Sequence, residues 1–309
     1  MGKVVKLGLG TESLGVKVGD RVGIKWISSA CGNCRMSHAP VLLFQSIFYL
    51  LTPVACHENV DAACSNAKLS GYYTPGTFQQ YTLGPASYVT PIPDDVPSDV
   101  AAPLLCAGVT VYSALKRSEA KPGNWVVISG AGGGLGHIAT QLSSGGLGHR
   151  VIGIDHGSKE ELVRESGAEH FLDITKFPAD DKGAALTAKV MELTGGRGAN
   201  AAIVCTNSNA AYAQAIPMLG INGTLVCVGV PEHEPQPIMT AFPGLLIGKH
   251  IKIVGSAVGT RREAIETMEF AARGIIKPHF RLEKMEKLTD VFEEMHRGEL
   301  KGRVVLDLS

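Results

Sequence analysis

Six short apolar runs separated by helix-like segments constrain the fold of this chain most. The runs are NWVVISG, VIGID, HFLDI, AAIVC, TLVCVGV and IKIVGSAVG. Continuous apolar runs of this length are typical of parallel strands that are buried on both faces. Helical patterns lie between them, opening at Ser158 and covering 184–194 and 208–218. Strands that alternate with helices predict a doubly wound α/β domain over roughly residues 116–257.

A glycine-rich loop follows the first of these strands. Its residues are Gly130, Ala131, Gly132, Gly133, Gly134, Leu135 and Gly136. The spacing is GxGxxxG, not the strict GxGxxG of dinucleotide-binding domains. Glycines at a strand-to-helix turn let the backbone approach a pyrophosphate, whose charge is met by N–H groups at the helix start. A lone glycine-rich turn is a weak signal, but this one sits between a strand and a helix.

An acidic residue ends the next strand at the expected distance. Asp155 lies 19 residues after Gly136, close to the ~20-residue spacing of the carboxylate that binds an adenosine ribose. The same charge would repel a 2′-phosphate, so the sequence favours NAD over NADP. Lys159 is a second candidate for this ribose. The alternative is that Asp155 is a solvated turn residue and Lys159 an exposed helix charge.

Composition excludes several classes of partner. Lys+Arg 29 balances Asp+Glu 29 in 309 residues, which argues against nucleic acid or an anionic membrane. The longest apolar run, 41–54, is shorter than the ~20 residues of a membrane-spanning helix. The chain has seven cysteines and no secretory h-region at its start, so we expect a reducing, cytoplasmic setting. The first 115 residues are predicted to form short strands and turns.

The cysteines cluster in two pairs. Cys31 and Cys34 form a CxxC pair, Cys56 and Cys64 are separated by seven residues, and 21 residues lie between the pairs. In a reducing compartment clustered cysteines more often hold a metal than form disulfides. Four unrelated thiols are the alternative.

In combination, several motifs resemble one family. They are DRVGIKW, ACGNC, LSGY, GTFQQY, APLLCAGVTVYSALK, WVVISGAGGGLGH, VIGIDHGSKEEL and IVGSAVG. The chain resembles the medium-chain, zinc-dependent alcohol dehydrogenases, and the tetrameric fungal branch most. The resemblance implies a GroES-like, β-rich catalytic domain (1–115), here partial, and a Rossmann domain (116–257). A C-terminal segment (258–309) would complete both. It also implies a homotetramer that oxidises primary or secondary alcohols to aldehydes or ketones with NAD and zinc.

By this resemblance the four cysteines are the ligands of a structural zinc. The family spacing is CxxCxxCxxxxxxxC, so the gap between Cys34 and Cys56 carries 19 surplus residues, 37–55. Lengthening this loop costs about 2 kcal/mol of closure entropy, against ~10–16 kcal/mol of binding for a structural zinc. We therefore expect the site in the 31–64 lobe to survive. The surplus is either a real loop or a retained short intron.

The same resemblance makes Cys106 the surviving ligand of a catalytic zinc, although a cysteine in an apolar helix is usually a core residue. The segment MGKVVKLG is similar to the family sequence just after its Gly-His-Glu motif. We therefore expect the chain to be N-terminally truncated and to lack the other ligands. Because catalytic zinc needs three protein ligands and an open position, we expect little turnover.

The cofactor contacts of the family carry over by position. Its glycine-loop contacts fall on Gly133, Gly134 and Leu135, and its ribose contacts fall on Asp155 and Lys159. The nicotinamide contacts fall on Val228, Val230, Ser256 and Val258, and a pyrophosphate contact falls on Arg303. Ordinary alternatives are core packing for the valines and a surface charge for the arginine.

Two other functions stay open. One is a non-catalytic NAD- and zinc-binding protein that assembles through the edge of the Rossmann domain. The other is a zinc-free, quinone-type reductase, against which the cysteine spacing and Cys106 argue. Metal analysis separates them, since the last needs no zinc.

Overall fold

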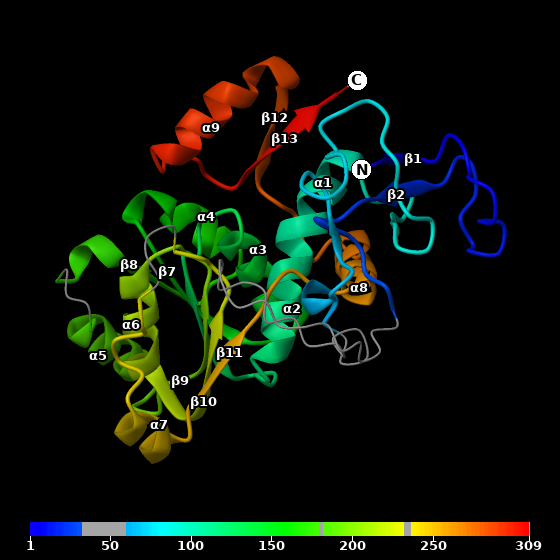
Figure 1. Cartoon of the computed structure of the whole chain (residues 1–309). Coiled ribbons are helices and arrows are strands. Elements are labelled where there is room, and N and C mark those ends of the chain that lie inside the picture. Colours follow the sequence, from blue (N-terminus) through cyan, green and yellow to red (C-terminus); the bar gives the residue numbers. More distant parts are fainter. Residues whose placement is uncertain (33–59, 179–181, 232–235, 309) are drawn as a thin grey trace.

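The computed structural model describes residues 1–32, 60–178, 182–231 and 236–308 (Figure 1). Its largest element is a six-stranded sheet in the order β11-β10-β9-β6-β7-β8, with every neighbouring pair parallel. The strands are β6 (Trp125–Ser129), β7 (Arg150–Asp155), β8 (His170–Asp173), β9 (Ala199–Val204), β10 (Leu219–Cys227) and β11 (Lys252–Gly255). Each predicted apolar run overlaps one strand, and the order is that of the Rossmann fold.

Helices cover both faces of this sheet, because the side chains of each strand alternate between two cores. In β6, Val126 and Ile128 join the core under α1 to α4 and α8, whereas Trp125 and Val127 join the core under α5 and α6. The helices are α1 (Ser98–Pro103), α2 (Val109–Arg117), α3 (Gly136–Gln141), α4 (Glu160–Glu165), α5 (Ala184–Leu193), α6 (Asn209–Met218), α7 (Pro243–Lys249), α8 (Arg261–Ala272) and α9 (Leu288–His296).

The region before α1 is built from much shorter strands. An antiparallel sheet has the order β1-β2-β5, and β3 pairs separately with β4. The strands are β1 (Gly2–Lys3), β2 (Arg21–Gly23), β3 (Ile27–Ser29), β4 (Lys68–Leu69) and β5 (Thr90–Pro91), and a 3₁₀ turn, η1 (Asp61–Ala63), precedes β4. In Figure 1 this region lies across α1 and α2 from the parallel sheet.

The prediction of strands and turns through residue 115 is wrong from Ser98 onward. Helix α1, the π-helical turn η2 (Leu104–Gly108) and α2 form one helical stretch. By length and composition alone these 20 residues could cross a bilayer, but 67% of the apolar window is buried inside the protein. The stretch is apolar because it packs into the core. The strand-like pattern of the residues before Ser98 therefore does not continue into it.

The C-terminal segment forms a separate small unit. Strand β12 (Phe280–Lys284) pairs in parallel with β13 (Arg303–Asp307), and α9 lies beside this pair (Figure 1). The remaining short helices are the π-helical turn η3 (Leu142–Gly146) and the 3₁₀ turns η4 (Gly157–Lys159), η5 (Ile174–Lys176) and η6 (Met285–Lys287).

Candidate cofactor and zinc sites

The glycine loop begins where β6 ends. The N–H groups of Gly130 and Ala131 both donate to the Ile154 carbonyl, at 2.9 and 3.1 Å. Gly130 has φ +79°, a left-handed conformation that glycine adopts without a Cβ penalty. A Cβ on Gly136 would lie 2.0 Å from the Gly130 oxygen. The start of α3 can therefore approach the strand end only with glycine here, which leaves bare backbone facing an incoming phosphate.

Asp155 ends β7 directly beside this loop. Its Oδ2 accepts a hydrogen bond from Gly132 N at 2.8 Å, and its Oδ1 accepts one from His156 N at 2.7 Å. Lys159 Nζ lies 3.7 Å from Oδ1, and both side chains are largely buried. The carboxylate is thus held in place next to the backbone of the glycine loop.

A cavity of about 520 Å³ opens next to Asp155. It lies at the carboxyl ends of β6 and β7, where doubly wound sheets bind their ligands. Its lining residues are mainly apolar and include Ser129, Gly130, Ile154, Ile174, Phe177, Thr206, Ala211 and Met218. The cavity has mainly apolar walls with a few polar groups, which suit the faces and the polar edges of a flat heteroaromatic ring such as adenine.

Strand β13 contacts the glycine loop through Arg303. Arg303 Nε donates to the Gly134 carbonyl at 2.9 Å, and Arg303 N donates to the His279 carbonyl at 2.9 Å. The pKa of the Arg303 guanidinium is lowered by burial, and the charge interaction with Cys106 opposes this shift. Arg303 is therefore no free surface charge: it is a cation placed against Gly134 of the glycine loop.

His137 also links the glycine loop to the C-terminal segment, and the sequence patterns did not single it out. Its ring is buried, and its Nε2 accepts a hydrogen bond from His279 N at 3.0 Å. Nδ1 therefore carries the proton that is donated to the Gly133 carbonyl at 2.7 Å. The pKa of His137 is lowered to about 4, mainly by burial; the Gly133 hydrogen bond opposes the shift, and the charges of Arg303 and His279 contribute to it. A neutral imidazole thus ties the glycine loop to the C-terminal segment.

The predicted nicotinamide residues lie at the carboxyl ends of β10 and β11. Ser256 N donates to the Cys227 carbonyl at 2.9 Å, which places Ser256 beside Val228. Val258 is buried, whereas Val230 is 57% exposed. Among the described residues, the Ser256 hydroxyl is one of four buried side-chain polar atoms without a hydrogen-bond partner. An orphaned hydroxyl at this place suits a polar ligand.

Two of the four predicted structural-zinc ligands come together. The β3–β4 ladder pairs Ile27 with Leu69, and it brings the Sγ atoms of Cys31 and Cys64 to 3.5 Å. Two thiolates on one tetrahedral zinc, at Zn–S ~2.3 Å, lie about 3.8 Å apart, so the pair fits a shared metal. Cys34, Cys56 and the surplus segment 37–55 lie outside the described residues.

Cys106 lies in the π-helical turn η2 and is exposed. Wide turns of this kind are frequent at functional sites, and a thiol used only for packing would be buried. Its neighbour Arg303 lies on the glycine loop, so Cys106 faces the cofactor side. Within the described part of the chain, no group of three His, Cys, Asp or Glu side chains could hold a metal ion.

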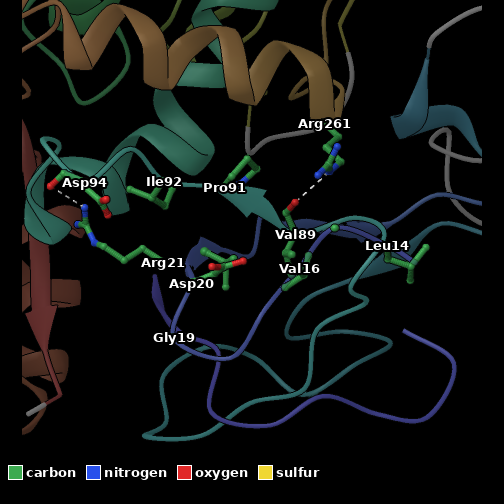
Figure 2. Close-up of a pocket in the computed structure, with 12 residues that line it drawn as sticks. Leu14, Val16, Gly19, Asp20, Arg21, Val89, Pro91, Ile92, Asp94 and Arg261 are labelled. Atoms are coloured by element: carbon green, nitrogen blue, oxygen red, sulfur yellow. Dashed lines mark hydrogen bonds between the residues drawn. The ribbon is translucent and has the colours of Figure 1, made fainter. Parts of the chain in front are cut away.

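Another cavity, of about 460 Å³, lies between the Leu14–Val22 segment and Val89–Asp94 (Figure 2). Arg21 and Arg261 reach its walls, but none of its lining residues is a predicted site residue. Among the described residues, the predicted cofactor and zinc residues therefore lie away from this cavity.

Comparison with known proteins identifies the family. Residues 1–94 match the alcohol dehydrogenase GroES-like domain, and residues 134–273 match the zinc-binding dehydrogenase domain. The chain is 64% identical to alcohol dehydrogenase 2 of Emericella nidulans over all of its length and 79% of that protein's. It is 40% identical to an alcohol dehydrogenase of Schizosaccharomyces pombe, again over all of the chain and 79% of that protein.

Solved structures agree. The alcohol dehydrogenase of Aeropyrum pernix superposes with a TM-score of 0.79 at 29% identity, covering 99% of this chain and 80% of that one. Acetophenone reductase of Geotrichum candidum, solved in complex with NAD, shares the fold with a TM-score of 0.76 at 24% identity, covering 99% and 78%. The chain belongs to the medium-chain, zinc-type alcohol dehydrogenases, a family of NAD- and zinc-dependent oxidoreductases.

Proposed function

We propose that NAD lies along the carboxyl edge of the parallel sheet. Adenine occupies the 520 Å³ cavity, and the adenosine ribose is held by Asp155 and Lys159. The pyrophosphate lies on the backbone of the glycine loop and against Arg303. The nicotinamide reaches the segment at Val228, Val230, Ser256 and Val258. The observation that supports the proposal is the Asp155–Gly132 hydrogen bond of 2.8 Å, because it holds the Asp155 carboxylate next to the backbone of the glycine loop.

The residues of this chain bind and orient the reactants. When bound, NAD would supply the hydride acceptor and zinc would supply a Lewis acid for the alcohol oxygen. Arg303 offsets the pyrophosphate charge, while His137 and Arg303 hold the carbonyls of Gly133 and Gly134. This fixes the direction in which the loop N–H groups point. Cys106 in η2 would supply one thiolate ligand to a catalytic zinc.

The Asp155→Asn variant tests the cofactor assignment. We expect the wild-type chain to bind NADH more tightly than NADPH, because the carboxylate repels a 2′-phosphate. The variant keeps a hydrogen-bond acceptor for Gly132 but loses the charge, so the preference should fall about tenfold, or about 1.4 kcal/mol. Titration calorimetry measures both dissociation constants, and Glu165→Gln, at an exposed position, is the matched control. An unchanged preference would contradict the assignment.

We propose further that Cys31, Cys34, Cys56 and Cys64 hold a structural zinc. The separation of 3.5 Å between two of their sulfurs supports this. The purified chain should then contain about one zinc at this closed site. Cys64→Ser should lose it, whereas Cys227→Ser, a thiol in β10, should retain it; atomic absorption measures both. A wild-type chain without zinc would instead favour the zinc-free, quinone-type reductase.

The expectation of little turnover by the 309-residue polypeptide stays a prediction. Ethanol-dependent reduction of NAD+ by the purified chain measures it. Binding of NADH and zinc without turnover would favour the non-catalytic alternative for this polypeptide. A rate typical of the family would refute both that alternative and the expectation of little turnover.

We also propose that the protein is a cytoplasmic homo-oligomer that assembles through β11. This strand is an edge strand of the sheet. Its own Ile253 is 38% exposed, and Ile247 in the preceding helix α7 is 72% exposed. Edge strands with apolar neighbours are ready templates for pairing with a second copy. Light scattering of the wild type and of Ile253→Asp should show a tetramer and a smaller species, respectively.

A further inference from the structure

A lysine of the N-terminal region is buried against the cofactor side of the Rossmann domain. Lys25 lies between β2 and β3 and is 2% exposed. Its Nζ donates to the Gly259 carbonyl at 2.8 Å, across 234 residues of sequence, and lies 3.4 Å from the Tyr88 hydroxyl. It also stands 4.8 Å from the centre of the Tyr88 ring. A buried lysine is rare unless it is paired, so this one requires an explanation.

The surrounding groups form one polar cluster that joins both regions. Tyr88 donates to the carboxylate of Asp61, and Arg261 N reaches the same oxygen at 3.4 Å. Figure 2 shows Arg261 reaching from the start of α8 to the Val89 carbonyl, where its Nε donates at 2.9 Å. Glu263 lies in the first turn of α8, where its carboxylate accepts a hydrogen bond from Thr260 N at 2.9 Å. The cluster therefore clamps the chain between Val258 and Glu263.

The clamped segment contains a strained residue. Val258 has φ +52°, which is an outlier for a β-branched side chain. Such conformations persist only where the surroundings enforce them, and they gather at ligand sites. Val258 is buried in a small core with Ile27, Val109 and Ala264. The next residue, Gly259, has no room for a side chain, since a Cβ would lie 2.7 Å from Val109 Cγ2.

This strained turn adjoins the orphaned hydroxyl of Ser256, two residues earlier. We propose that Lys25 is a positioning residue: by holding the Gly259 carbonyl it keeps Val258 in its left-handed conformation and so shapes the segment that receives the nicotinamide. This inference rests on the proposed NAD site. It assigns to the N-terminal region a direct part in orienting the cofactor's reactive ring.

The surroundings of Lys25 also shift its pKa. Burial lowers its pKa to about 8, Asp61 and Glu263 oppose the shift, and Arg261 adds to it. The amine thus remains a hydrogen-bond donor to Gly259 in both protonation states. Replacing it by methionine keeps the apolar stem, removes the donor and buries no charge, so the Lys25→Met variant should fold.

The test compares two ligands, NADH and ADP-ribose, of which only NADH has a nicotinamide. In the full chain, Lys25→Met should weaken NADH binding about tenfold, or about 1.4 kcal/mol, and leave ADP-ribose binding within about twofold. Lys25→Arg, which restores a donor, should recover part of the NADH affinity. Titration calorimetry gives all the constants, and circular dichroism checks folding.

Lys249→Met is the matched control. Lys249 also holds backbone carbonyls, those of Pro217 and Leu219 at 3.3 and 2.7 Å, but at the amino end of β10. Its loss should affect both ligands equally. Equal weakening by Lys25→Met would show a merely structural role, and unchanged NADH binding would remove any role; either result overturns the inference. A wild-type chain that binds neither ligand would instead refute the proposed NAD site.

Discussion

The parallel sheet and the region before α1 are built on different principles. The strands of the sheet have four to nine residues, and most of their side chains are buried in the two large cores. The strands before α1 have two or three residues, and large apolar side chains there stay exposed, such as Leu9 at 102% and Leu83 at 95%. The sheet is therefore stabilised by burial, which is spread over many residues.

The first region depends instead on a few specific polar links. Arg21 donates to the carbonyls of Pro93 and Val96, both at 2.6 Å, and the dashed line in Figure 2 marks its bond to Asp94. Lys25 holds Gly259, and the β3–β4 pair closes the cysteine lobe. Single substitutions should therefore have their largest effects at different kinds of residue in the two regions.

In the sheet, the largest effect is expected where the backbone packs most closely. Gly136→Ala would place a methyl group 2.0 Å from the Gly130 oxygen, a backbone atom that cannot move aside as a flexible side chain can. We expect a loss of more than about 4 kcal/mol in the free energy of unfolding, with loss of NADH binding. Urea unfolding measures it.

Gly248→Ala is the control for this substitution. Gly248 lies in α7 with nothing within 4 Å of its added Cβ, so alanine should stabilise the chain by about 0.5–1 kcal/mol. Similar effects of the two changes would show that close packing at the glycine loop is not the cause.

The buried Lys25 of the first region should give the wild type a pH-dependent contribution to stability that Lys25→Met removes. The pKa of Lys25 is lowered from 10.5 to about 8, so between these pH values the unfolded chain binds more protons than the folded one. The free energy of unfolding should rise with pH across this window, by up to about 3 kcal/mol at 1.36 kcal/mol per unit. Urea unfolding of the wild type and Lys25→Met at pH 7 to 10 measures the rise. Parallel curves for the two proteins would contradict it.

A smaller contrast separates two arginines. Arg21→Met removes charged hydrogen bonds to partly buried carbonyls and should cost about 2 kcal/mol. Arg150→Met removes an ion pair with Glu169 in which both side chains are more than 40% exposed, so water and salt screen the pair and its loss should change the free energy of unfolding less than Arg21→Met does. Hydrogen exchange should show the first change near β2 and β5 and leave β6 protected. Equal losses in the free energy of unfolding for the two variants would mean that polar links are no more important to the first region than to the sheet.

The parts that sequence patterns predicted well are those with a local signature. Buried parallel strands leave continuous apolar runs, and the glycine loop lies between β6 and α3 as expected. Asp155 could be placed beside that loop because adjacent parallel strands end at the same edge. The helical stretch from Ser98 was missed, since the region around it has short strands and its own apolar residues lack a clear boundary. The role of His137 was missed too, because its partner His279 is 142 residues away.

By itself, the sequence determined the family, the alternation of six strands with helices, the cofactor class and the spacing of the four cysteines, since each is written in local spacing and residue type. Only the tertiary structure decided that Cys31 and Cys64 meet at 3.5 Å and that Arg303 and His137 hold the glycine loop. It alone also placed Lys25 against Gly259. These contacts join segments distant in the chain, and their free energy depends on burial and hydrogen-bond geometry, which no local pattern records.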